Sequence, residues 1–260
     1  MTSSLNRLFQ SKDLLWAWTG RNIRARYQQS VMGGLWIVIQ PLATVLIFST
    51  IFTLFVPIDT GDVPYPIFSY VAVVPWMLLA NSLNDMTSSL IANMQLVTKI
   101  YFPREILPLS ALLARLLDFV VAALILLLLI FYYQMPIYPI AWMALPVVFV
   151  IQVTFVLGLG LMLSAANVFY RDIGPLLTLV IQLWFYASPI IYPITMVPER
   201  FRQFYFLNPM SGILTAYRDI LLQGRLPSTY LIPAAIIAAV VLLVGFSFFK
   251  RVEFQFADIV

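Results

Sequence analysis

The chain of 260 residues contains no cysteine and no histidine. The lack of cysteine excludes a disulfide framework, a thiolate nucleophile and a metal site with sulfur ligands. The lack of histidine removes the usual proton shuttle and the commonest metal ligand. Charged residues are also scarce, at 10% of the chain, whereas a soluble domain has about 25%. We therefore expect no metal site, no cofactor and no catalytic residues in this chain.

Two sequence signals are missing as well. None of the ten glycines is followed by lysine, so the chain has no G-x-x-x-x-G-K-[ST] phosphate loop and cannot bind ATP by that route. No cleavable signal peptide is evident, because the first apolar run starts near Val31, after a charged segment that is too long for an n-region. The net charge of +4 is small, and basic residues at membrane edges account for it without a nucleic-acid partner.

Apolar residues dominate instead, at 62% of the chain with a mean hydropathy of +0.94. Six apolar segments come close to the roughly 20 residues that span a bilayer as a helix. They are residues 34–56, 67–83, 106–133, 140–163, 176–192 and 230–249. This pattern predicts an all-α membrane protein, with one transmembrane domain over residues 1–260 and six spans per protomer.

Basic residues occur before the first, third and fifth spans and after the sixth, whereas the loops 57–66 and 134–139 have no lysine or arginine. By the positive-inside rule both termini, the segment 93–105 and the loop with Arg171 are cytoplasmic. The segment 193–229 carries four arginines on the predicted outer side, which long external segments tolerate. Its prolines leave apolar stretches too short to cross. We expect one or two re-entrant or interfacial half-helices there, or else a folded external cap.

The N-terminal region 1–30 predicts a cytoplasmic helix that lies in the membrane interface. Over residues 16–28, Trp16, Ile23 and Tyr27 fall on one helical face, and Arg21, Arg24 and Gln28 fall on another. Basic amphipathic helices lie at the membrane surface with the apolar side toward lipid. A simple topology anchor is the alternative interpretation.

A polar island, Lys99–Glu105, separates the second and third spans and has Pro103 at its centre. Proline removes a backbone donor and clashes with the preceding helical turn. The island therefore predicts a short, broken element displayed at the membrane surface, as a docking surface would be.

Ionisable residues inside the spans are rare, and such residues are functional candidates by default. Arg115 and Asp118 lie three residues apart and can pair on one helix, or they can contact a substrate; Asp85 lies near the end of the second span. Gly158, Gly160 and Ser164 offer a small-residue face, which favours close helix packing over a substrate path.

Aromatic residues make up 15% of the chain. An interfacial aromatic belt explains them, and a channel lined with flat amphipathic rings is the alternative. The candidates are Trp36, Phe68, Tyr70, Trp76, Tyr132, Trp184, Tyr186 and Tyr192.

Four groups of motifs together resemble one family along the whole chain. They are Arg21–Tyr27 with Gly33-Gly34-Leu35-Trp36 and Gln40-Pro41-Leu42, the segment 93–109, Asn167–Ile173, and Leu207-Asn208-Pro209-Met210 with the tail Phe256–Val260. The sequence resembles the type-2 ABC exporter permeases for surface polysaccharides, and within them the O-antigen and teichoic-acid exporters.

The resemblance implies a homodimer in the bacterial cytoplasmic membrane that assembles with two copies of a separate ABC ATPase, which binds ATP and Mg²⁺. Lipid-linked polysaccharide and membrane lipids are the other implied partners. Contacts to the ATPase are implied for Lys99, Tyr101, Phe102, Pro103, Arg104, Glu105, Arg171 and Asp172. A cytoplasmic entrance is implied at Arg21, Arg24, Arg26 and Tyr27, and a polymer channel between protomers.

Three alternative functions stay open. The same machinery could export a drug or a small lipid. An intramembrane enzyme acting on polyprenyl lipids would need acid–base or metal-binding groups, which the composition hardly supplies. A passive membrane scaffold would leave the rigid, basic island unexplained.

Overall fold

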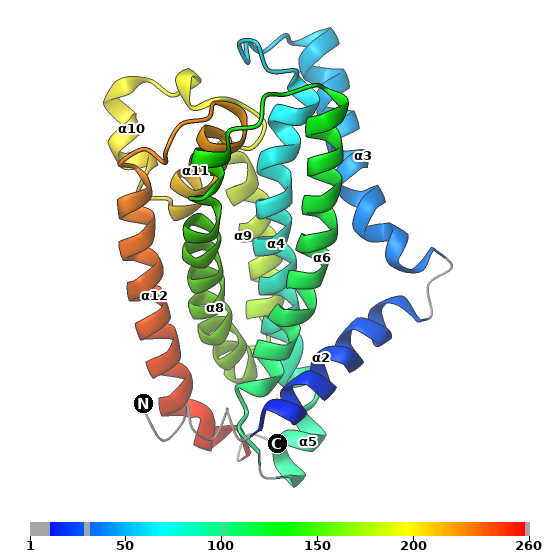
Figure 1. The fold of residues 1–260 in the computed structure, drawn as a ribbon. Helices are drawn as coiled ribbons and strands as arrows, with labels where there is room; N and C mark the ends of the chain where they lie inside the picture. The colour runs from blue at the N-terminus through cyan, green and yellow to red at the C-terminus, as the bar shows by residue number, and fades with distance from the viewer. Residues whose placement is uncertain (1–10, 29–31, 101, 258–260) are drawn as a thin grey trace.

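The computed structural model describes residues 11–28, 32–100 and 102–257, and within these ranges every regular element is helical. Figure 1 shows a bundle of long helices. Among the described residues, five helices are long and apolar enough to cross a membrane. They are Gly33–Phe55 (η1 Gly33–Leu35, α3 Trp36–Thr50, η2 Ile51–Phe55), α4 Tyr65–Ala92, α6 Ile106–Tyr132, Pro139–Phe169 (α7 Pro139–Trp142, α8 Leu145–Phe169) and Leu231–Phe256 (α12 Leu231–Val252, then η4 Glu253–Ala257). The predicted all-α membrane fold is confirmed.

The segment predicted as the fifth span, 176–192, forms the shorter helix α9, Ile173–Tyr186. Its 14 residues cover about 21 Å, less than the roughly 30 Å of hydrocarbon. The helix ends where Pro189 and Pro193 follow, and turns carry the chain onward. The chain nevertheless passes from the end of α8 to α10 at the opposite end of the bundle (Figure 1).

Helix α2 (Lys12–Tyr27), helix α5 (Met94–Lys99) and the last turns of α12 lie at one end of the bundle (Figure 1). The loops after η2 and after α6 lie at the other end together with α10 (Glu199–Tyr205). This is the arrangement that the distribution of basic residues predicts. Which end faces the cytoplasm stays a prediction.

Helix α4 is the centre of the bundle and packs against α3, α6, α8, α9 and α11. It continues to Ala92, nine residues beyond the predicted end at Leu83. One face of the added turns contacts protein: Met86, Thr87, Ser89 and Leu90 are buried, and the Asn167 side-chain amide donates to the Thr87 carbonyl at 2.9 Å. The apolar run ended the predicted span early because polar residues such as Asp85 and Ser89 lower the hydropathy of these turns.

Helices α8 and α12 cross where glycines bring the backbones together. A Cβ atom on Gly245 would collide with the Gly158 carbonyl, and one on Gly158 would collide with the backbone at Leu242. A Cβ on Gly160 would meet Met86 of α4, and Ser164 is buried. Close packing therefore explains this small-residue face.

Two short helices, α10 and α11 (Pro209–Leu222), occupy the segment predicted to hold half-helices. Asn208 caps α11: its side-chain oxygen accepts from the Met210 backbone N–H at 3.1 Å and from the Trp184 indole at 2.9 Å. A proline follows directly at the first helical position, where its missing N–H is harmless. Their depth in the membrane stays a prediction.

Arg218 on α11 is one of the arginines that depart from the positive-inside rule, but its guanidinium is buried inside the protein. It donates to the carbonyls of Pro189 and Ile190, at 2.5 and 2.6 Å, and lies 3.7 Å from the Phe68 ring centre. Burial lowers the pKa of Arg218 to about 9, so the group is still charged at neutral pH. It holds the irregular backbone that follows α9.

The candidate aromatic residues differ in how far they are buried. Phe68, Tyr70 and Trp76 are buried within the protomer, so they neither face lipid nor line a channel, which corrects both interpretations for these three. The Trp76 ring meets the Trp184 ring edge-on at 5.8 Å, as core aromatics do. Of the remaining candidates, Trp36, Tyr132 and Tyr186 are exposed and Trp184 and Tyr192 are half-buried.

The glycine crossing gives a stability prediction. Gly245→Ala places a methyl group against the α8 backbone, and the forced separation of the helices should cost about 1–3 kcal/mol. The midpoint of thermal unfolding in detergent should fall by several degrees. The control is Gly34→Ala, whose new Cβ has no neighbour within 4 Å. Equal midpoints for the two variants would contradict the packing role.

Candidate functional site

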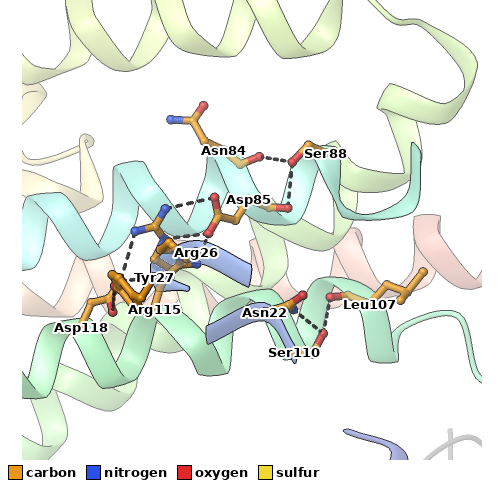
Figure 2. Close-up of polar contacts among 10 residues, drawn as sticks. All are labelled: Asn22, Arg26, Tyr27, Asn84, Asp85, Ser88, Leu107, Ser110, Arg115 and Asp118. Carbon is orange, nitrogen blue, oxygen red and sulfur yellow. Dashed lines mark hydrogen bonds and ion pairs between the residues drawn. The ribbon is translucent and has the colours of Figure 1, made fainter. Parts of the chain in front are cut away.

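Four charged side chains and a tyrosine meet where α2 joins α4 and α6, and we call them the charge cluster (Figure 2). The cluster consists of Arg26, Tyr27, Asp85, Arg115 and Asp118. Arg26 bridges the two carboxylates: its Nη2 lies 2.6 Å from Asp85 Oδ2, and its Nη1 lies 2.7 Å from Asp118 Oδ2. One residue of α2 thus connects both neighbouring helices.

Arg115 forms a second bridge between the same carboxylates. Its Nε donates to Asp85 Oδ2 at 2.7 Å and its Nη1 to Asp118 Oδ2 at 3.1 Å. The Tyr27 hydroxyl donates to Asp118 Oδ1 at 2.7 Å, and burial followed by this hydrogen bond raises the pKa of Tyr27. The four charged side chains are 15–29% exposed. Two guanidinium groups and two carboxylates make the cluster neutral.

Polar contacts continue along α2. The Asn22 side-chain amide donates to Ser110 Oγ at 3.1 Å, and Arg21 Nη1 donates to Asn93 Oδ1 at 3.0 Å. Asn22 and Arg26 lie four residues apart, so they share a helical face. The face of α2 that contacts the bundle therefore carries these polar groups together with Trp18, which packs against buried apolar side chains.

This geometry corrects the predicted apolar face of α2. Tyr27 points into the charge cluster, away from lipid, while Trp16 is 66% exposed. Of the residues predicted at the entrance, Arg21 and Arg24 are exposed at the helix surface, and Arg26 and Tyr27 are cluster members. The entrance role itself stays a prediction.

The predicted Arg115–Asp118 pair exists as part of this larger cluster. The sequence interpretation missed that Asp85 and Arg26 complete it. A signal was present: Asp85 has no basic residue one helical turn away on either side, so its charge needed a partner from another helix.

Two small cavities flank the cluster. The first, about 220 Å³, has an apolar wall that includes Trp36, Pro41 and Phe119, and its polar lining includes Arg26 and Asp118. The second, about 200 Å³, is lined by polar groups such as Asn22, Asp85 and Ser88 together with Trp18. The cluster thus lies between two clefts of mixed polar and apolar lining.

The predicted coupling segment, 93–105, contains α5 and ends directly before α6. Lys99 and Ile100 are exposed, whereas Val97 is buried against the bundle. Phe102, Pro103 and Arg104 are half-buried, and Tyr101 lies outside the described residues. Arg171 and Asp172 are exposed in the loop between α8 and α9.

Glu105 is placed differently from the prediction. It is 1% exposed, and its Oε1 lies 2.7 Å from Lys250 Nζ on α12. A side chain buried in this way is not free to contact another protein. The implied ATPase contact at Glu105 is therefore replaced by an internal ion pair.

Known proteins similar to this chain identify its family. The family model described as ABC-2 type transporter matches residues 13–222, from α2 through α11. The chain belongs to the ABC-2 type transporter family. The resemblance found in the sequence motifs is confirmed, and the charge cluster lies wholly within the matched region.

Relatives extend the similarity over the entire chain of this family member. It is 31% identical to the O-antigen export system permease protein RfbA of Klebsiella pneumoniae over 260 residues, covering 100% of this chain and 98% of the relative. The permease of the same name from Myxococcus xanthus is 31% identical over 263 residues, covering 99% of both. The polysialic acid transport protein KpsM of Escherichia coli is 23% identical over 245 residues, covering 90% and 91%.

The charge cluster predicts that Arg26 holds α2 on the bundle. In Arg26→Gln the two aspartates keep only Arg115 as their cationic partner, so α2 should detach more often. The reporter is Ser110→Cys, a buried position beneath α2 in a chain with no cysteine of its own. Its reaction with a hydrophilic maleimide should become about tenfold faster, the gain expected for losing a partly buried pair worth about 1–2 kcal/mol.

The matched control for this measurement is Arg24→Gln, which removes an exposed arginine from the same helix. It should leave the labelling rate of the Ser110→Cys reporter unchanged. If both variants label at the same rate, the cluster does not hold α2.

Proposed function

We propose that this chain is the permease subunit of an ATP-driven exporter that moves a lipid-linked surface polysaccharide, of O-antigen or teichoic-acid type, across the cytoplasmic membrane. The observation that carries the proposal is the 31% identity to O-antigen export permeases along 100% of the chain. Polysialic acid transport, the function named for a more distant relative, also concerns a polysaccharide. The relatives therefore favour a polysaccharide over a drug or a small lipid.

The motor of this exporter is a separate ABC ATPase that binds ATP and Mg²⁺. The chain has no phosphate loop of its own, and α5 presents Lys99 and Ile100 on an exposed surface. Arg171 and Asp172 are exposed in the loop between α8 and α9, at the same end of the bundle. The ATPase must contact two conformations of the permease with different affinity, because otherwise ATP binding would shift no population.

A homodimer with its channel between protomers fits the apolar face of α3 and α9. The two helices touch through aromatic side chains, since the rings of Phe48 and Phe185 stack 5.7 Å apart. Both helices expose large apolar side chains, among them Leu46, Ile47, Leu179 and Leu183. Exposed Trp36 and Tyr186 on these helices are the aromatic residues that we propose for the channel.

Both termini and the coupling segment face the cytoplasm in this proposal. The lipid-linked glycan enters beside α2, where the amphipathic cleft of about 220 Å³ adjoins Trp36 and the charge cluster. An apolar wall suits a lipid tail, and polar groups at one end suit its headgroup.

The assembly is tested by co-expression with the ABC ATPases of the source organism. We expect one of these ATPases to co-purify with this chain. A deletion strain should accumulate lipid-linked polymer in the cytoplasm and lack surface glycan, as measured by surface labelling. Failure to co-purify would remove the transporter proposal, and normal surface glycan in the deletion strain would remove the cargo assignment.

The docking surface is tested by Lys99→Glu, which reverses an exposed charge on α5. Export and ATPase co-purification should fall by about tenfold, as for a charge reversal at a contact surface, while membrane insertion is unchanged. Arg200→Glu is the control, because it makes the same charge change on α10 at the opposite end of the bundle. Equal export by the two variants would exclude Lys99 from the contact.

A further inference from the structure

The coupling segment rests on a small core of its own at one end of the bundle. Buried side chains from α4, α5, α6, α8, α12 and η4 form this core, and we call it the end core. Its members are Leu90, Val97, Leu107, Leu161, Ala165, Val168, Phe249 and Phe256. The larger core of the bundle is a separate cluster. The coupling segment is thus packed as a unit with the end of the chain.

An ion pair fixes the coupling segment to the last span. Lys250, in the final turn of α12, donates to Glu105 Oε1 at 2.7 Å and to Glu253 Oε2 at 2.9 Å. Glu105 is the residue directly before α6, and its side chain is 2% exposed. A charge buried to this degree is stable only with its partner in place. The separation of Glu105 and Lys250 is therefore strongly constrained.

The turn η4 adds an aromatic contact beneath α5. Phe256 is fully buried, with its ring 5.7 Å from that of Phe249 and 6.0 Å from that of Phe169. The Arg104 guanidinium lies 5.8 Å from the Phe256 ring centre. Since η4 packs on α5, the chain beyond α12 folds back under the coupling segment.

We propose that Lys250 and Phe256 are positioning residues of the coupling segment, tying it to α12. This inference rests on the proposed function, in which an ATPase pushes on α5. Along the chain α5 is flanked by α4 and α6, and the ion pair and the aromatic contact add α12 as a third connection. A displacement of α5 then moves α12, and the glycine crossing passes it on to α8.

The first test uses the permease alone in lipid nanodiscs, so it does not depend on the ATPase. Spin labels are placed at Thr98→Cys on α5 and Ser247→Cys on α12, both exposed positions in a chain without cysteine. The distance distribution measured by pulsed electron paramagnetic resonance should be narrow and single. Lys250→Met should broaden it, whereas Arg251→Met, which removes the exposed neighbouring charge, should not. Equal widths in the two variants would overturn the positioning role.

The second test uses the complex with the ATPase. Lys250→Met and Phe256→Ala should lower ATP-driven export by about tenfold, the size of effect seen when a coupling contact is lost, while the ATPase still co-purifies. Unchanged export in both variants would overturn the inference. If the variants fail to fold, the doubly labelled chain without either substitution still tests the inference. Its 98–247 distance should stay the same when ATP binds. A change in that distance would show that α5 and α12 move separately. Loss of co-purification in the parent chain would instead point to failure of the proposed function.

Discussion

Pairing of charge in a place with little water is the constraint on which this bundle depends. Arg26, Asp85, Arg115 and Asp118 come from three helices and neutralise one another. Removing one member would leave a partly buried charge without its partner, at a cost of about 1–2 kcal/mol. The positions of α2, α4 and α6 are therefore set together. Apolar packing alone would let these helices slide, because lipid tails are as apolar as leucine.

The charge cluster and the end core share helix α4. Asp85 belongs to the first and Leu90 to the second, and both lie on the same uninterrupted helix. Five residues of helix separate them by about 8 Å. The surface that we propose for the ATPase and the surface that we propose for substrate entry are thus connected through less than two turns of one rigid element. A change at either place can act on the other through α4 itself.

The sequence predicted the all-helical fold and most of the membrane spans, because long apolar runs indicate helices that face lipid. It failed where side chains face protein. The end of α4 was placed too early because Asp85, Thr87 and Ser89 are polar, and the buried Glu105 was expected at a surface. In both cases the partner is distant in the chain: Arg26 for Asp85 and Lys250 for Glu105. Local spacing revealed Arg115–Asp118 because those residues lie one turn apart.

Arg26 is the only charged residue that α2 contributes to the charge cluster. The net charge of the cluster therefore depends on whether α2 is in place. If α2 moved away, Asp85, Asp118 and Arg115 would be left with a net charge of −1, two carboxylates against one guanidinium. Movement of α2 away from α4 and α6 therefore separates opposite charges and leaves an anionic cavity beside the membrane. Cations from the adjacent water would be drawn into it, so the ease of opening should depend on the ionic strength of the solution at this end of the bundle.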